Sequence, residues 1–244
     1  MNMEYKIEYI KKTQVSKDAW DLHFIKPEDF DYKAGQFIEV DMKLNHPDER
    51  GHKRWFTLSS SPTEQTLDIT TRKLPKHSTF KDVLFKLQKG DKINIKGPDG
   101  SFTLPSKTTK LAWIAGGIGI TPFRSQMKFM SDKKIYDYDI VLLNGNRTFE
   151  DNICRSLIEN YAEKNSSFKY IEILSENIPR DWNGEEGYIN KMLIKKHIKD
   201  MSIRHFYVSG PEAMVDAIKA MLTTMGVKDS HIHQDWFPGY SDMF

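Results

Sequence analysis

The chain has 244 residues, of which 39% are hydrophobic and 12% aromatic, so it is long enough for two domains of ordinary size. Its 36 lysine and arginine residues nearly balance 34 aspartate and glutamate residues, and the net charge of +2 gives no reason to expect a nucleic acid partner. One cysteine excludes an internal disulfide, a four-cysteine zinc site and an all-cysteine iron–sulfur cluster.

Hydropathy patterning favours an aqueous compartment. Residues 1–12 mix charged and apolar side chains and lack the apolar stretch of a signal peptide. No later segment approaches the roughly 18 uninterrupted apolar residues of a membrane-spanning helix. We therefore expect a cytoplasmic protein without an integral membrane segment.

The N-terminal part, from Tyr5 to Leu104, carries short alternating apolar runs separated by turn formers. The clearest runs are residues 36–41, 67–70 and 92–95. This period of two predicts antiparallel strands that form a small β-barrel or sandwich. Residues 78–87 instead have helical spacing, with Ser78 or Thr79 as the expected N-cap.

The C-terminal part alternates buried strands with helices. We expect strands at 110–115, 139–143, 169–174 and 204–208, and helices at 123–130, 151–162 and 213–225. Such alternation predicts a parallel sheet covered on both faces. Glycine and proline cluster near residues 97–107, so we assign 1–105 to an antiparallel β-barrel domain and 106–244 to an α/β parallel-sheet domain.

Two segments are candidates for ligand binding. Residues 114–122, Ile-Ala-Gly-Gly-Ile-Gly-Ile-Thr-Pro, place a glycine turn between a strand and a helix whose free amides suit an anion such as a pyrophosphate. A tight turn needed only for packing is the alternative. Residues 54–62 combine an arginine, two aromatic rings and several hydroxyls, which suits a ligand with a phosphate and a flat ring, although a half-exposed edge strand has the same composition.

Four segments together resemble the ferredoxin–NADP reductase superfamily, most closely its bacterial-type FAD-dependent oxidoreductases. They are residues 54–57, 97–102, 116–122 and 209–214, in the family's order and spacing. The resemblance implies an FAD-binding antiparallel β-barrel followed by an α/β domain that binds a nicotinamide nucleotide.

The resemblance also implies roles for individual residues. It assigns FAD binding to Arg54, Trp55, Phe56, Thr57, Thr71, Ser78 and Thr79. Arg54 resembles the arginine that pairs with the FAD pyrophosphate, Phe56 the aromatic ring packed on the isoalloxazine, and Thr57 the catalytic hydroxyl near flavin N5. The pair Lys76-His77 stands where many members have glycine.

For the nicotinamide nucleotide, the resemblance implies a second set of residues. They are Gly116, Gly117, Gly119, Thr121, Pro122, Arg147, Gly210, Pro211 and Met214. Ser209 takes the position of a cysteine found in many relatives near the hydride path, and we treat it as catalytic. The choice between NADH and NADPH stays open, because Arg147 suits a 2′-phosphate whereas Glu176 repels one.

The remaining candidates carry less chemistry. In the C-terminal region, Phe237 or Tyr240 covers the flavin face or else anchors the tail on the barrel. His231 and His233 alternate on an expected strand without an evident third ligand, so we expect no metal site. Cys154 is expected to pack in the core.

These assignments predict an FAD-dependent oxidoreductase that transfers hydride from NAD(P)H to flavin N5. Its electrons then pass to a carrier such as ferredoxin or flavodoxin, to another protein or to a small-molecule acceptor. A free-flavin or ferric reductase and a non-catalytic flavin-binding electron-transfer subunit are the alternatives.

Overall fold

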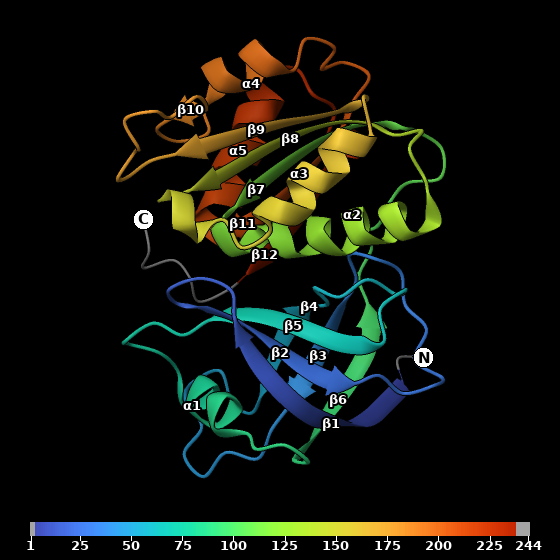
Figure 1. The fold of residues 1–244 in the computed structure, drawn as a ribbon, viewed down its shortest axis with the longest axis vertical. Helices are drawn as coiled ribbons and strands as arrows, with labels where there is room; N and C mark the ends of the chain where they lie inside the picture. The colour runs from blue at the N-terminus through green and yellow to red at the C-terminus, as the bar shows by residue number, and fades with distance from the viewer. Residues whose placement is uncertain (1–2, 238–244) are drawn as a thin grey trace.

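The computed structural model describes residues 3–237. Two six-stranded sheets divide these residues, one formed before Pro105 and the other after it. Figure 1 shows the sheets stacked along the long axis of the molecule, with helix α2 (Thr121–Lys133) at the junction between them. Strands of the first sheet end at Asp99 and those of the second begin at Lys110, while the exact domain boundary at residue 105 stays a prediction.

The first sheet is antiparallel throughout, with the order β4-β3-β6-β1-β2-β5. Its strands are β1 (Met3–Gln14), β2 (Ala19–Ile25), β3 (Phe37–Asp41), β4 (Lys53–Thr57), β5 (Thr66–Arg72) and β6 (Lys92–Asp99). A bridge between Leu58 and Ile69 joins the residue after β4 to β5, so the sheet curls toward closure. Alternate residues such as Ile38 and Val40 of β3 are buried inside, as the period of two predicts.

Helix α1 (Thr79–Lys86) confirms the helical segment expected between β5 and β6. Ser78 is its N-cap, and the Ser78 Oγ accepts a hydrogen bond from the Lys81 amide at 3.3 Å. Phe80 and Leu84 are fully buried in the barrel core. The core therefore fixes the direction in which the helix N-terminus points.

The second sheet is parallel, with the order β10-β9-β8-β7-β11-β12. Its strands are β7 (Lys110–Gly116), β8 (Asp139–Asn146), β9 (Phe168–Leu174), β10 (Glu185–Glu186), β11 (His205–Pro211) and β12 (Ile232–Phe237). Helices α2 and α3 (Arg155–Lys164) pack on one face, and α4 (Lys191–His197) and α5 (Glu212–Thr224) pack on the other. The predicted doubly covered sheet is confirmed.

Strand β7 lies between β8 and β11, so the chain reverses its direction of progress across the sheet at this strand. Ligands of open parallel sheets bind beside the carboxyl ends of the strands at such a point. The glycine turn at 116–119 follows β7 directly. Topology therefore places the glycine turn where a ligand crevice is expected.

The helix expected at 151–162 starts later than predicted. Residues Phe149–Asp151 form a 3₁₀ turn, in which Thr148 and Asp151 cap each other, and α3 begins only at Arg155. Cys154 is the residue before that helix and is buried, as expected of a core cysteine. The reciprocal cap stabilises the start of this short turn, which ends at Asn152 before α3 begins.

Candidate active site between the barrel and the parallel sheet

A pocket of about 300 Å³ opens at the carboxyl ends of β7, β8 and β11, and we call it the α/β pocket. Of the residues expected to bind a nucleotide, it is lined by Gly116, Gly117, Arg147, Pro211 and Met214. Gly119, Thr121, Pro122 and Gly210 lie in the same segments but do not line it. The segments singled out in the sequence thus come together, although only part of each faces the pocket.

The turn needs glycine at each of these positions for a different structural reason. A Cβ on Gly119 would lie 2.2 Å from the carbonyl oxygen of Ser209, and a Cβ on Gly116 would lie 2.2 Å from the Met214 sulfur. These two glycines let the turn approach β11 and α5, which is the packing role that the sequence also allowed. Gly117 differs, because it has a φ of +51° and its backbone lies on the pocket wall.

Two polar side chains in the α/β pocket suit a phosphorylated ligand. The Asn146 Nδ2 is buried and has no hydrogen-bond partner among the described residues. A buried donor without a partner is costly, so it favours a polar ligand atom beside it. Arg72, from β5 of the barrel, also lines this pocket, and its Nη2 would lie 3.4 Å from a Cβ placed on Gly117.

Arg72 is held in place by carboxylates. Its Nη1 donates to both oxygens of Asp18, at 2.8 and 3.1 Å, and lies 3.5 Å from Asp151. The guanidinium is nearly fully buried, and it brings a positive charge from the barrel to the glycine turn of the other domain. Sequence inspection missed Arg72, because nothing local distinguishes an arginine at the end of a strand.

A second, smaller cavity of about 110 Å³ lies in the barrel, and we call it the barrel pocket. It is lined by Arg54, Trp55, Phe56, Thr57, Thr71 and Ser78, among the residues expected to bind FAD. Thr79 follows at the start of α1 and does not line it. The α1 N-terminus opens onto this cavity, where its free amides favour an anion.

Arg54 is buried at the wall of the barrel pocket, with 6% of its surface exposed. Its Nη2 donates to Asp48 at 2.5 Å, and its Nη1 donates to the carbonyls of Arg50 and Gly51. The Arg54 guanidinium lowers the pKa of the Asp48 carboxyl against the opposing effect of burial. The loop before β4 thereby fixes the orientation of the guanidinium.

The aromatic and hydroxyl residues of 54–62 separate into two groups. Phe56 lies 6.0 Å from Phe80, centroid to centroid, beneath the barrel pocket, and the Trp55 side chain is 58% exposed at its rim. The hydroxyls of Ser59, Ser60 and Ser61, however, do not line the barrel pocket. A ligand-binding role for these three hydroxyls therefore stays a prediction.

The two pockets meet. Ile118, in the glycine turn, lines both of them. Thr57 of the barrel and Ser209 of β11 both donate a hydrogen bond to the same oxygen, the Asp235 Oδ2, at 3.3 and 3.4 Å. The two residues expected to be catalytic are thus joined through one carboxyl group.

Asp235 is the residue that sequence inspection missed at this junction. It lies on β12, which pairs with β11 so that Asp235 stands opposite Ser209. Burial raises the pKa of the Asp235 carboxyl to about 7, although the hydrogen bonds from Thr57 and Ser209 favour its ionised form. The group can therefore hold or release a proton near neutral pH.

Other expected residues lie away from the junction or beyond description. Phe237 is the last residue of β12. The predicted roles of the Phe237 side chain and of Tyr240 concern parts of the chain that lie outside the described residues. His205 and His233 lie 3.1 Å apart through their ring nitrogens. Within residues 3–237, no three metal-binding side chains are arranged to hold an ion, and no helix there has the length and apolarity to cross a membrane.

Comparison with known proteins agrees with this geometry. Residues 6–104 match the oxidoreductase FAD-binding domain family, and residues 113–220 match the oxidoreductase NAD-binding domain family. Together the two ranges cover most of the chain. The chain therefore belongs to the oxidoreductases in which an FAD-binding domain is followed by an NAD-binding domain.

Relatives with names share modest identity with this chain. It is 27% identical over 240 residues to a subunit of the Na⁺-translocating NADH-quinone reductase of Idiomarina loihiensis, covering 89% of this chain and 57% of that protein. It is 25% identical over 238 residues to the glycine betaine monooxygenase reductase subunit of Chromohalobacter salexigens, covering 93% and 63%. The chain thus spans about three fifths of the length of these relatives.

The fold is shared with solved structures. A ferredoxin–NADP⁺ reductase from Neisseria gonorrhoeae with bound FAD and NADP superposes with a TM-score of 0.78 at 19% identity, covering 95% of this chain and 98% of that one. FAD and a nicotinamide nucleotide also fit the chemistry seen here, because each pocket combines an arginine, a helix or turn N-terminus and apolar walls.

Replacing Gly119 with alanine tests the close approach of the turn to β11. The added Cβ would overlap the Ser209 carbonyl, so we expect Gly119→Ala to lower the free energy of unfolding by about 1–3 kcal/mol. Gly145→Ala is the control, because its Cβ would meet the flexible end of Ile189 at 3.3 Å and the Ala115 carbonyl at an ordinary contact distance of 3.7 Å. Urea denaturation measures both variants, and equal losses would contradict the packing account.

The raised pKa of Asp235 predicts a pH-dependent stability. Between pH 4 and pH 7 the folded protein retains a proton on Asp235 that the unfolded chain releases, so stability falls as the pH rises through this window. Asp235→Asn removes the effect, so its stability relative to wild type should rise by about 4 kcal/mol between pH 4 and pH 8. Urea denaturation at both pH values measures this change. The control is Asp216→Asn, because Asp216 is exposed on α5. A constant difference between Asp235→Asn and wild type across this range rules out the assignment.

Proposed function

We propose that this protein is an FAD-dependent NAD(P)H reductase that passes electrons from a nicotinamide nucleotide to a separate acceptor. One observation carries the proposal: the pocket of the FAD-binding domain and the pocket of the NAD-binding domain share a wall at Ile118. Bound FAD would supply the hydride acceptor at flavin N5. The chain's own contribution is to bring the two rings together and to keep them in register.

Each expected FAD-binding residue has a physical task. Arg54 and the amides at the start of α1 supply positive charge for the FAD pyrophosphate. Phe56 offers a ring face at the floor of the barrel pocket, and the Thr57 hydroxyl lies at the junction with the other domain. In the α/β pocket, Arg72 and the backbone of Gly117 suit the pyrophosphate of the nicotinamide nucleotide.

Asp235 would hold a proton beside the reacting rings. Its carboxyl contacts the hydroxyls of Thr57 and Ser209, one from each domain. With a pKa near 7, it exchanges a proton with solvent or with the flavin at neutral pH without a large energetic penalty. Ser209 would therefore do more than fill a small space beside the rings, because its hydroxyl would orient the Asp235 carboxyl.

The electron acceptor is a protein or small molecule outside these 244 residues. We propose a carrier protein of the ferredoxin or flavodoxin kind. A single cysteine leaves no four-cysteine iron–sulfur cluster within the chain. The named relatives are a subunit of a quinone reductase and a reductase subunit of a monooxygenase, which supports passage of electrons to a partner.

The purified protein tests this function directly. We expect it to retain FAD through gel filtration and to lose its yellow colour anaerobically on addition of NADH or NADPH. Arg54→Ala should weaken FAD binding at least tenfold, because a buried charge-assisted contact is lost, while Arg180→Ala, on an exposed loop, should not. Loss of FAD from wild type would favour a free-flavin reductase, and retained FAD without bleaching would favour a non-catalytic subunit.

We further propose that NADH is preferred over NADPH. Arg147, which lines the α/β pocket, lies 3.9 Å from both Asp18 and Asp151, the carboxylates that also hold Arg72, so part of its charge is already offset. The Glu176 amide donates to the Arg147 carbonyl at 2.7 Å, so an exposed acidic residue is held next to Arg147 by the backbone. A 2′-phosphate beside Arg147 would therefore meet an arginine shared with two carboxylates and a neighbouring acidic residue, which disfavours a dianion.

This preference predicts a kcat/KM for NADH at least tenfold above that for NADPH. Glu176→Gln should raise kcat/KM for NADPH several-fold by removing one repulsive charge, with little change for NADH. Glu159→Gln, on the exposed side of α3, is the matched control. Steady-state kinetics with both nucleotides decide the matter, and a wild type that favours NADPH refutes the preference.

A further inference from the structure

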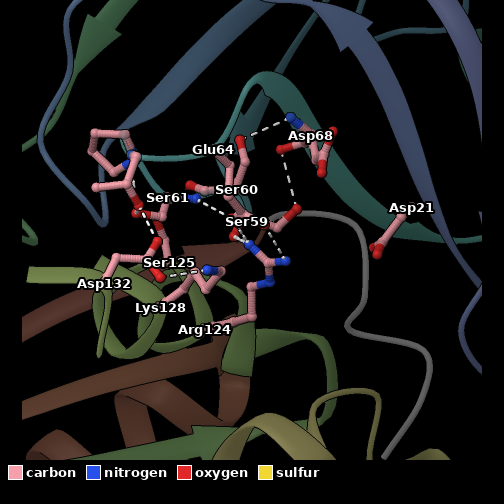
Figure 2. Close-up of polar contacts among 12 residues, drawn as sticks. Asp21, Ser59, Ser60, Ser61, Glu64, Asp68, Arg124, Ser125, Lys128 and Asp132 are labelled. Carbon is pink, nitrogen blue, oxygen red and sulfur yellow. Dashed lines mark hydrogen bonds and ion pairs between the residues drawn. The ribbon is translucent and has the colours of Figure 1, made fainter. Parts of the chain in front are cut away.

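The serines that follow β4 lie at the boundary between the two domains. Figure 2 shows Ser59, Ser60 and Ser61 facing the first turns of α2. Ser60 and Ser61 are fully buried, and Ser59 nearly so. Because they line neither the α/β pocket nor the barrel pocket, binding of the proposed cofactors leaves these hydroxyls unexplained.

Hydrogen bonds cross the boundary from α2. The Arg124 Nη1 donates to the Ser59 carbonyl at 2.9 Å, and the Ser125 hydroxyl donates to the Ser60 carbonyl at 2.5 Å. Arg124 also forms a two-pronged ion pair with Glu64, whose Oε1 lies 2.9 Å from Nη2 (Figure 2). We call Ser59, Ser60, Glu64, Arg124 and Ser125 the interdomain clamp.

The barrel side of the clamp is itself rigidly held. The Ser60 Oγ accepts a hydrogen bond from the Asp68 amide at 2.9 Å, and the Tyr32 hydroxyl donates to the Ser60 carbonyl at 3.0 Å. Glu64 accepts a hydrogen bond from the Ser61 amide at 2.7 Å through the oxygen that also faces Arg124. The clamp therefore joins α2 to the body of the barrel rather than to a loose loop.

The two sides of the clamp adjoin the two sides of the proposed hydride path. Ser59 comes two residues after Thr57, a span of about 7 Å at most. On the other side, Arg124 is in the first turn of the helix that follows the glycine turn directly. A shift of α2 against the barrel would therefore change the distance between Thr57 and the glycine turn by a similar amount.

We propose that Arg124 and Glu64 are positioning residues for hydride transfer, which set the separation of the nicotinamide and flavin rings without contacting either. The inference rests on the proposed reductase function. Bidentate arginine–carboxylate pairs are directional, so this pair fixes rotation as well as distance. A displacement of about 1 Å between reacting groups can slow a reaction on the order of a hundredfold.

The first test compares Arg124→Gln and Glu64→Gln with wild type by anaerobic stopped flow. We expect each variant to slow flavin reduction at saturating NADH about tenfold or more, while FAD content and the Kd for NAD⁺ stay within about twofold. The double variant should be no slower than the worse single variant, since either single substitution already removes the Arg124–Glu64 ion pair. Lys133→Ala is the control, because Lys133 is exposed in the last turn of the same helix.

A second measurement does not depend on activity. Hydrogen exchange should become faster in residues 59–64 and in the first turns of α2 in both clamp variants, and stay unchanged in β8. Ser125→Ala removes one hydroxyl and should show the same pattern more weakly. This variant provides the test if Arg124→Gln and Glu64→Gln do not fold.

The outcomes separate this inference from the proposed function. Unchanged reduction rates in well-folded clamp variants overturn it, and so does a parallel loss of rate, FAD and nucleotide affinity, which would indicate general destabilisation. If wild type is not reduced by either nucleotide, the proposed function fails, and hydrogen exchange alone then decides whether the clamp couples the domains.

Discussion

The backbone of the glycine turn packs directly against β11, and this close approach sets the position of everything around the site. Gly119 leaves no room for a Cβ beside the Ser209 carbonyl. The turn therefore packs on Ser209 with no side chain between them, and Ile118, in the same turn, forms a wall for both pockets. A closely packed turn of this kind limits the relative movement of two ligands that are bound in different domains.

Charge at the site is distributed so that arginines are fixed before any ligand arrives. Arg54 is held by Asp48 and by loop carbonyls, and Arg72 by Asp18. Pre-orientation of this kind reduces the entropy lost on binding a phosphate. Asp235 is the contrasting group, because burial without a cationic partner keeps its pKa near neutrality.

Local pattern in the sequence was sufficient for the fold and for part of the site. Alternating runs and glycine turns depend on neighbouring residues, so the antiparallel sheet, the parallel sheet and the Ser78 cap are confirmed. Asp235 and Arg72 reach the site only through strand pairing and domain packing, which leave no trace in local spacing. The serines after β4 have the composition of a binding segment, yet they lie at the domain boundary, where the backbone carbonyls of Ser59 and Ser60 accept hydrogen bonds from Arg124 and Ser125.

The most direct test of the account is a crystal structure of the protein with FAD and a nicotinamide nucleotide bound. The account predicts FAD in the barrel pocket with its pyrophosphate at Arg54, and the nucleotide pyrophosphate between Gly117 and Arg72. It also predicts nicotinamide C4 about 3–3.5 Å from flavin N5 beside Ile118. A structure in which both ligands bind in full, but with protein side chains separating their rings and no path for them to meet, would contradict the shared site.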